Sequence, residues 1–489
     1  MTLRIYQPIA TGDFDLAEQK ADFGVGPTYS AAELIIRIEG RPLGQLRVQL
    51  TSGTCSGESL TKLSEAQFGT DIAEYELRNW LLRNQVELTL PSATIAICTR
   101  NRTEDLAKML PAVLIQVPAV NVLVIDNAPS TDATKALLLE KFPGVRYVRE
   151  TRPGLDWARN RAVIESTTEL ILFVDDDAFP DARWSHTVRA LFARDPWIGA
   201  VTGLTVAHEL ETEAQNDFER TGAFNRGYKR KWGIPVPTSV GWSAGHLMGI
   251  GDFGVGANMA FRRTALIRAG LFDPALDAGT ITGGAGDLNM MFRVVKHGFK
   301  IVYEPAAIVR HRHRRTNAEL KRQLFANGAV IGYLQSLHDS FPEERDAYRY
   351  ISGWIARYLS HQLLNSLGPA PRIRSDLAWA ETKGYAHAIA ARTYRRAQRK
   401  ADELSSTSSE PKIERGLCPL GLPPIVQYAQ AIDVDIDDGI DAWVGLTGSQ
   451  TAIVNFRYKG SIVSVGHILN GGRGASDEQL VDALVESLR

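Results

Sequence analysis

Three consecutive carboxylates, Asp175, Asp176 and Asp177, follow the apolar run Leu170–Val174 in the stretch FVDDDAFPD. Because like charges repel, such a cluster at the mouth of a buried strand requires a counter-charge. Side chains alternate along a strand, so we expect Asp175 and Asp177 to point the same way and Asp176 to point away. An Asp-x-Asp pair suits Mg²⁺ or Mn²⁺ bound together with the phosphate oxygens of a ligand. The alternative is a solvated loop whose acids cap a helix.

A second group of candidate residues lies downstream, in GGAGDLNMMFRVVKHG and in the strand-like segment that ends in HRH. Asp287 stands where a glycine-rich loop leads into a helix, which suits either a general base beside an open cavity or a simple N-cap acid. His311 and His313 suit either a structural strand end or ligation of a metal by at least one of them.

The elements that must position these residues lie between about Pro91 and His313, where short apolar runs alternate with amphipathic segments. The runs TIAIC, VLVID, VRYV and LILFV predict buried strands, each followed by a helix. This alternation predicts an α/β domain with a mostly parallel sheet covered by helices. In such sheets ligands collect at the carboxyl ends of the strands. The polar residues that follow the four strands are Thr99, Arg100, Asn101, Arg102, Asp126, Asn127, Arg149 and the three aspartates.

The two ends of the chain resemble each other. ELIIRIEGRPLGQLRVQL and AIVNFRYKGSIVSVGHIL each read as strand, glycine turn and strand, followed by a helix, with Arg37 and Gly40 aligned to Arg457 and Gly460. A lone hairpin is marginally stable, so we expect these modules to pair or to pack on the central domain. The predicted organisation is an N-terminal hairpin-helix module, a central α/β domain, a helical extension, a polar linker and a C-terminal module, at residues 1–90, 91–315, 316–404, 405–425 and 426–489.

Composition narrows the class of protein. With 489 residues, 44% of them hydrophobic and 23% charged, the chain is long enough for several globular domains. A formal net charge of −1 gives no support for binding nucleic acid, and three scattered cysteines predict neither a disulfide framework nor a zinc site. We expect a cytoplasmic protein. The basic run Arg392–Lys400 predicts a solvated helix face or, as the alternative, peripheral contact with the inner face of an anionic membrane.

Seven motifs in order, CTRNR, VIDNAPSTDAT, RPGLDWARNRA, FVDDDAFPD, GANMAFRR, GGAGDLNMMFR and HRH, resemble those of family 2 glycosyltransferases of the GT-A fold. The resemblance covers about Pro91 to Arg315. It implies an inverting transfer of a sugar from a nucleoside-diphosphate sugar, with UDP as the nucleotide, to a hydroxyl of a glycan, lipid-linked or small-molecule acceptor. Mn²⁺ or Mg²⁺ is the implied cofactor.

The resemblance also implies roles for individual residues. Asp287 would be the catalytic base, and Asp177 would bind the metal, together with Asp175 and with His311 or His313. The implied nucleotide-sugar-binding residues are Thr99, Arg100, Asn101, Arg102, Asp126, Asn127, Arg159, Asp175, Asp176, Gly256 and Asn258.

Two departures from the family pattern accompany this resemblance. The family commonly has Glu before the base and a second acid after it, where this chain has Gly286 and Asn289, and Ala128-Pro129 replaces a usual glycine. Three rival functions stay open: a glycosidase with two acids flanking a glycan, a sugar nucleotidyltransferase, and a non-catalytic nucleotide- or carbohydrate-binding protein. The nucleotidyltransferase would be expected to carry a glycine-rich phosphate loop at the first strand, and CTRNR has no glycine.

Overall fold

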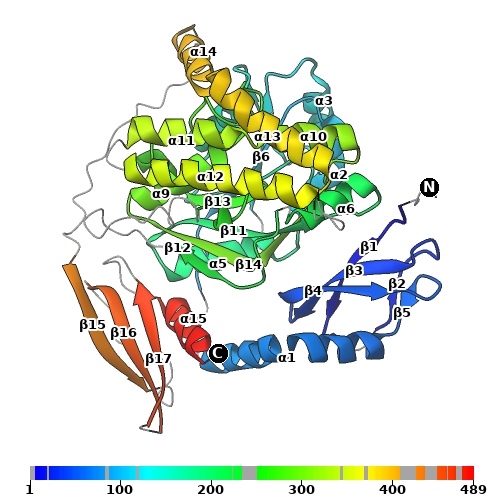
Figure 1. The fold of residues 1–489 in the computed structure, drawn as a ribbon, viewed down its shortest axis with the longest axis vertical. Helices are drawn as coiled ribbons and strands as arrows, with labels where there is room; N and C mark the ends of the chain where they lie inside the picture. The colour runs from blue at the N-terminus through cyan, green and yellow to red at the C-terminus, as the bar shows by residue number, and fades with distance from the viewer. Residues whose placement is uncertain are drawn as a thin grey trace.

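The structure is a computed structural model that describes residues 6–18, 21–82, 88–116, 120–222, 224–233, 250–341, 345–367, 373–407, 426–435, 449–459, 461–469 and 476–488. Its centre is a large twisted sheet covered by helices, with one small module attached from each end of the chain (Figure 1). The predicted fold class, a mostly parallel sheet with helical cover, is confirmed.

The central sheet joins a parallel half to a mixed half. The parallel half contains four strands in the order β8 (Arg146–Glu150), β7 (Asn121–Asn127), β6 (Ala93–Thr99) and β9 (Leu170–Val174). The mixed half continues with β13 (Asn258–Arg262), β11 (Ile198–Ala207) and β14 (Lys300–His311), flanked by β10 (Ala178–Pro180) and β12 (Lys231–Gly233). Strands β13, β10 and β12 run antiparallel to their neighbours.

Two hydrophobic cores lie on the two faces of this sheet. In β6, Ile95 and Ile97 belong to one core and Ala96 to the other, as strand alternation requires. The first core packs against α2 (Thr103–Leu114), α3 (Ala133–Lys141) and α5 (Trp184–Arg194). The second packs against α4 (Leu155–Glu165), α8 (Arg263–Arg268) and α9 (Gly286–Lys296). Burial of each large aliphatic side chain contributes roughly 1.5–3 kcal/mol, so these cores hold the strand ends in fixed positions.

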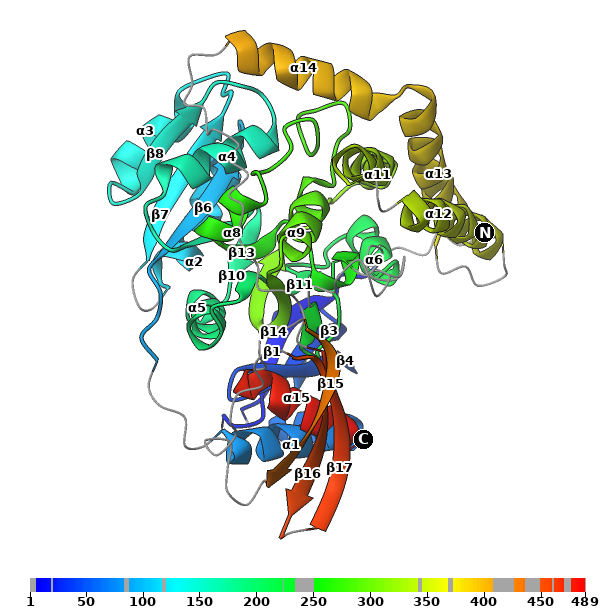
Figure 2. The same ribbon diagram turned by 90° about the vertical axis from the view of Figure 1, so that its left-hand side faces the viewer.

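A helical layer extends the second core outward. It comprises α10 (Asn317–Ala326), α11 (Ala329–Ser340), α12 (Arg345–Ser366), α13 (Ser375–Ala390) and α14 (Thr393–Thr407). Helix α11 packs on α9 and α10 packs on α6 (Glu213–Arg220), while α14 lies along the top of the molecule in Figure 2. Across the described residues, every helix is too short or too polar to cross a bilayer. The basic residues of α14 that are exposed lie opposite the buried Tyr394 and Ala397. Such a face is either solvated or attracts an anionic surface.

The two terminal modules share one topology. In the N-terminal module, β1 (Ala10–Asp15) pairs in parallel with β3 (Ala31–Ile38), which forms a hairpin with β4 (Arg41–Gln49) and is followed by α1 (Gly57–Leu81). A short pair, β2 (Phe23–Gly24) with β5 (Thr54–Cys55), lies beside it. The C-terminal module repeats the arrangement with β15 (Val426–Asp435), β16 (Ser449–Tyr458), β17 (Ser461–Leu469) and α15 (Asp477–Ser487).

The two modules also share the irregularities of their hairpins. The hairpin register shifts at Arg37 in one module and at Arg457 in the other, and the turns place Glu39 and Lys459 at φ of 49° and 48°. Each module contains a third strand, β1 or β15, that pairs in parallel with the hairpin, in addition to the strands of the predicted hairpin. The predicted linker lies mostly outside the described residues, and α14 continues into its first residues, through Thr407.

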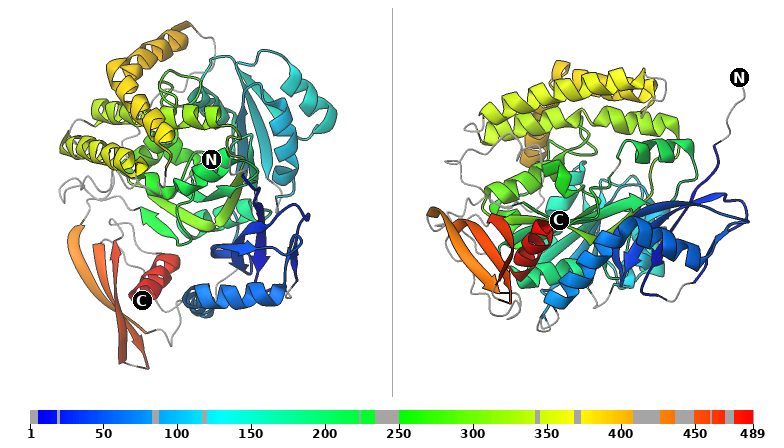
Figure 3. Two further views of the ribbon diagram at one scale, coloured as in Figure 1. Left: turned by 45° about the vertical axis from the view of Figure 1, so that its right-hand side comes forward. Right: turned by 60° about the horizontal axis from the view of Figure 1, so that its bottom comes forward.

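A buried charge cluster joins the two modules to the central sheet. Near its end, α1 inserts Leu81 into the core of the C-terminal module, and α1 and α15 lie together in both views of Figure 3. Arg78 of α1 pairs with Glu478 and Asp482 of α15. Arg230, just before β12, pairs with Glu478 and with Glu304 of β14. Segments more than 200 residues apart in sequence therefore share one set of ion pairs.

We expect Glu478→Gln to lower the free energy of unfolding in a pH-dependent way. Although burial opposes it, the guanidinium groups of Arg230, Arg78 and Arg194 lower the pKa of Glu478 from 4.5 to about 2. A carboxyl pKa that is lower in the folded state stabilises the protein above the unfolded pKa, and this contribution is lost as pH falls from about 5 to 2. The free energy of unfolding of Glu478→Gln should be about 3 kcal/mol below that of the parent at pH 7, and the difference should vanish near pH 2.

Urea titrations of both proteins between pH 2.5 and 7 measure this difference. Glu58→Gln is the matched control, because Glu58 pairs with Lys62 on an exposed helix face. A constant difference between Glu478→Gln and the parent across that range would contradict the assigned role.

Candidate functional site

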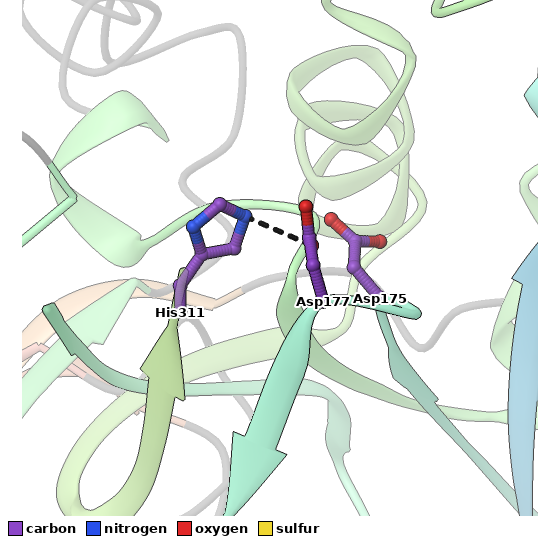
Figure 4. A group of neighbouring side chains, drawn as sticks. All are labelled: Asp175, Asp177 and His311. Carbon is purple, nitrogen blue, oxygen red and sulfur yellow. Dashed lines mark ion pairs between the residues drawn. The ribbon is translucent and has the colours of Figure 1, made fainter. Parts of the chain in front are cut away.

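The carboxyl end of β9 and the end of β14 bring three ligand-type side chains together. The antiparallel pairing of β10 with β14 sets Ala178 opposite His311, so the imidazole comes beside the acids that follow β9. One ligand atom from each of Asp175, Asp177 and His311 lies within 4.8 Å of the other two, as Figure 4 illustrates. Nε2 of His311 is 3.2 Å from Oδ1 of Asp177.

Charge in this cluster is unevenly distributed. Burial and the neighbouring Asp177 raise the pKa of Asp175. Burial also acts to raise the pKa of Asp177, but His311 and Arg102 outweigh it and hold that pKa below the usual range. Arg102 reaches Oδ2 of Asp177 at 2.8 Å, and Arg314 lies 3.6 Å from the same atom. Two carboxylates and one imidazole form a donor set that fits Mn²⁺ or Mg²⁺, so these three residues would hold the ion.

Asp176 points the other way, toward the end of β6. Its Oδ2 accepts from the Thr99 hydroxyl at 2.7 Å and its Oδ1 accepts from Arg102 at 2.6 Å. Burial raises the pKa of Asp176 to about 7, although Arg102 acts against it. Arg102 thus supplies the counter-charge for two of the three acids. Thr99 and Asp176 are both buried and hydrogen-bonded within the fold, and their predicted binding role stays a prediction.

A chain of two histidines and a glutamate supports the cluster from behind. Nδ1 of His311 contacts Nδ1 of His313 at 3.2 Å, and Nε2 of His313 contacts Oε1 of Glu219 on α6 at 2.6 Å. Phe218 and Phe224 pack edge-on against the imidazoles. The ring nitrogens of His313 thus face His311 and Glu219, whereas Nε2 of His311 faces Asp177, so His311 is the histidine that lies in the cluster.

This chain specifies one proton arrangement when His311 uses Nε2 as a ligand atom. Its Nδ1 must then carry the proton and donate to Nδ1 of His313, whose Nε2–H donates to Glu219. The carboxylate of Glu219 therefore sets the tautomer of His313 and, through it, that of His311.

Arg159 of α4 connects the cluster to the other side of the site. Its Nη1 donates to Oδ1 of Asp156 at 2.9 Å and also pairs with Asp277. Burial acts to lower the pKa of Arg159, but Asp277, Asp156, Asp175 and Asp287 together raise it well above its ordinary value. The guanidinium of Arg159 thus contacts two carboxylates and is influenced by the charges of two more, Asp175 and Asp287.

Asp287 lies near the start of α9 and is partly exposed. The backbone N–H of Gly256 donates to its Oδ2 at 2.7 Å, and its own helix contributes the N–H of Leu288 to Oδ1 at 2.8 Å. A Cβ at position 256 would lie 2.8 Å from Nη2 of Arg159 and 3.2 Å from Asp287, so only glycine fits between them. Burial and Asp277 raise the pKa of Asp287, which suits a group that accepts a proton near neutral pH.

The glycine before Asp287 has a steric origin. A Cβ at Gly286 would lie 2.1 Å from Oδ2 of Asp156, and that oxygen is buried with no hydrogen-bond partner among the described residues. The Asp156 carboxyl therefore occupies the space that a side chain at position 286 would enter. An acid therefore lies beside position 286, but it is Asp156 of α4 and not residue 286 itself. Asn289, the second departure, is buried and donates to Ser336.

The rim around β7 holds the other predicted binding residues. Asp126 is fully buried and accepts from Tyr147 at 3.1 Å, while its Oδ1 has no partner among the described residues. Burial raises the pKa of Asp126. Arg100 and Asn101 are exposed, and Asn101 has φ 55° and accepts from Ser130, which ties the two loops together. Arg100, Asn101 and Asp126 thus lie at one rim.

Two predicted binding residues are structural. The amide of Asn127 donates to the Arg152 carbonyl and accepts from the Gly154 N–H, which fixes the loop before α4. Asn258 is 1% exposed, accepts from Trp184 and donates to two backbone carbonyls between β11 and β14. Both amides are hydrogen-bonded inside the fold, and their predicted contact with the donor stays a prediction.

Sequence reasoning missed Glu219, Asp156 and Asp277, because each acts through a partner that no motif connects to it. Glu219 lies in the polar stretch EAQNDFER with no motif around it. Asp156 lies within a quoted motif, and its position three residues before Arg159, one helical turn, could have indicated their ion pair.

Comparison with known proteins places the site in a family. Residues 94–246 match the family described as Glycosyl transferase family 2. The predicted resemblance to family 2 glycosyltransferases is confirmed over this segment. The segment covers β6 to β12 and therefore includes the Asp175–Asp177 pair and Arg159, while Asp287 and His311 lie beyond it.

The curated relatives and solved structures that resemble the chain are distant. Pre-mycofactocin glycosyltransferase from two strains of Mycobacterium tuberculosis is 22% identical over 243 residues, 48% of this chain and 46% of the relative. The chain thus spans about half the length of those relatives. Among solved structures, mannosyltransferase PcManGT from Pyrobaculum calidifontis, in complex with GDP-Man and Mn²⁺, is 18% identical with a TM-score of 0.37, covering 71% of this chain and 98% of that one. GalNAc-T7 with UDP, GalNAc and Mn²⁺ is 15% identical with a TM-score of 0.38, at 58% and 59% coverage.

We expect Glu219→Ala to weaken Mn²⁺ binding by roughly 10- to 100-fold, because loss of the carboxylate frees the tautomers of both histidines. Glu219→Gln should recover much of this loss, since its carbonyl oxygen still accepts from Nε2–H of His313. Titration followed by the electron paramagnetic resonance signal of free Mn²⁺ measures the affinity.

Glu213→Ala serves as the control, because Glu213 lies on the same helix with an exposed side chain. Equal affinities for all three variants would show that the histidine chain has no influence on the cation site.

Proposed function

We propose that this chain is an inverting, metal-assisted glycosyltransferase. It moves a sugar from a nucleoside-diphosphate sugar, with UDP as the nucleotide, to a hydroxyl of a glycan, lipid-linked or small-molecule acceptor. The observation that carries the proposal is the presence in one domain of the cation-type cluster Asp175, Asp177 and His311 and of a partly exposed carboxylate, Asp287, whose pKa is raised. The match of residues 94–246 to the family described as Glycosyl transferase family 2 supports the same reaction class.

The donor is assigned to the rim formed by β6, β7 and β9. Asp175, Asp177 and His311 would hold a divalent cation, which would offset negative charge on a diphosphate. Arg100 and Arg102 lie at the same strand ends and add cationic side chains to a region that must accept a diphosphate. Asp126, with one free acceptor oxygen, is assigned to the nucleobase.

The acceptor is assigned to the side of Asp287. Its hydroxyl oxygen attacks the anomeric carbon, the bond from that carbon to the diphosphate oxygen breaks, and the hydroxyl proton passes to Asp287. A single displacement of this kind inverts the anomeric configuration. The two N–H groups on Asp287 hold the carboxylate in place, and the absence of a side chain at Gly256 leaves room for Arg159 beside it.

Asp287→Asn should lower the rate of transfer by roughly 10²- to 10⁴-fold while leaving Mn²⁺-dependent nucleotide binding unchanged, because the amide cannot accept the proton. The raised pKa of Asp287 predicts that activity of the parent falls with decreasing pH at a value above the ~3.9 of an ordinary aspartate. Transfer assays with product analysis by nuclear magnetic resonance give both the rate and the anomer.

Asp252→Asn, on an exposed 3-10 turn (Ile250–Phe253), is the control and should keep full activity. Retained transfer by Asp287→Asn would exclude the base assignment, and a product with retained configuration would exclude the single displacement.

Asp126→Ala should weaken UDP binding by roughly 10-fold or more, since a hydrogen bond to a charged acceptor is worth about 1.5–3 kcal/mol. Uracil carries a ring N–H that can donate a hydrogen bond to the carboxylate of Asp126. Thermal stabilisation by UDP, GDP, ADP and CDP with Mn²⁺ measures the preference. Inorganic pyrophosphate is the matched ligand without a base and should bind parent and variant equally. A parent that prefers ADP or CDP would refute the assigned base.

A further inference from the structure

A cavity of about 470 Å³ lies where the two terminal modules meet the central sheet. Its walls come from β4 and α1 of the N-terminal module, from β12, and from β17 and α15 of the C-terminal module. Strand β12 pairs with the first half of β14, with Lys231 opposite Tyr303, whereas His311 ends that strand. The cavity is therefore separate from the metal cluster. Its volume lies within the range of small-molecule sites, which often form between domains.

One arginine in this cavity lacks a partner. Arg78 and Arg230 both pair with acids, whereas the guanidinium of Arg41, at the start of β4, forms no hydrogen bond or ion pair with any residue that the structure describes. Burial lowers the pKa of Arg41, and the charges of Arg78 and Arg230 lower it further despite Glu304. A guanidinium carries five N–H donors, and the side chain of Arg41 is partly exposed, so its donors are available to a ligand in the cavity.

The acids near Arg41 are already committed to other groups. Glu304 is bound by Arg230 and by the backbone of Ala306, and Asp482 is bound by Arg78 and the Trp232 indole. The cavity walls carry five cationic side chains and four acidic ones, namely Arg41, Arg78, Lys229, Arg230 and Lys231 against Asp71, Glu74, Asp482 and Glu486. Of the three arginines in these walls, Arg78 and Arg230 are paired with acids, and Arg41 has no acid partner in the described part of the chain.

We propose that this cavity is a second ligand site, which binds a small oxyanion, carboxylate or phosphate, on the guanidinium of Arg41. A bidentate oxyanion matches the planar fork of arginine. Tyr75, Tyr228 and Trp232 also line the cavity and offer an aromatic surface to an organic part of the ligand. Because the walls belong to three parts of the chain, bound anion fastens the two modules to the central domain. The site is independent of the proposed glycosyl transfer.

The test compares thermal unfolding of the full chain with inorganic phosphate and with citrate, at constant ionic strength and with EDTA present. We expect a saturable rise in Tm of about 3 °C for the parent. Arg41→Gln should abolish this rise, and without anion it should unfold at the parent's temperature or higher, because an unpaired cation has been removed. Arg47→Gln, on the exposed face of the same strand and paired with Glu33, should behave as the parent.

The outcomes distinguish an anion site at Arg41 from a purely structural arginine and from anion binding at the metal cluster. A purely structural Arg41 predicts a lower Tm for Arg41→Gln without anion and no anion-dependent rise in the parent, which would overturn the proposal. A rise that persists in Arg41→Gln but disappears in Asp177→Asn would assign the anion to the metal cluster and would equally overturn it. The probe that saturates at the lower concentration distinguishes a phosphate ligand from a carboxylate.

Discussion

The site depends on one buried guanidinium, that of Arg159. A carboxylate buried without a counter-charge is strongly unfavourable, and this region contains four around the same cation: Asp156, Asp175, Asp277 and Asp287. Arg159 sits on α4, whose apolar face packs against the second core, so its position is set by the packing of the domain. The close approach of Arg159 and Asp287 leaves no room for a Cβ at position 256, and the orientation of Asp156 leaves none at position 286. Two glycines of the motifs thus follow from one ion-pair arrangement.

The sheet distributes the chemistry over two sides of this cation. The parallel strands deliver Asp126, Asp175 and Asp177 to one rim, and the β10–β14 pairing adds His311 to it. Asp287 arrives from the other side on α9, held by backbone N–H groups alone. The cation-type cluster next to Arg102 and the carboxylate of Asp287, whose pKa is raised, need different surroundings. The strand ends provide one and the start of α9 provides the other, within one domain.

The terminal modules also depend on buried ion pairs and on a shared hydrophobic core. Each is a three-stranded sheet with one helix, too small to bury a large core alone. Leu81 of one module completes the core of the other, and Arg78, Arg230 and Glu478 fasten both to β14. Buried ion pairs of this kind stabilise an interface only when every member has a partner, whereas the partly exposed Arg41 beside them has no ion-pair partner among the described residues.

The sequence by itself determined the alternation of strands and helices, the rim at which Asp175 and Asp177 meet, the position of Asp287 at a helix start and the repeat at the two ends. These follow from local patterns: strand alternation, apolar runs, and glycine turns. Only the tertiary structure decided that His311 rather than His313 faces Asp177, that Asn127 and Asn258 are saturated inside the fold, and that Asp156 takes the space beside Gly286. Glu219 and His313 are 94 residues apart, and Arg230 and Glu478 are 248 apart. Such partners are chosen by how the cores pack, and no local pattern encodes that choice.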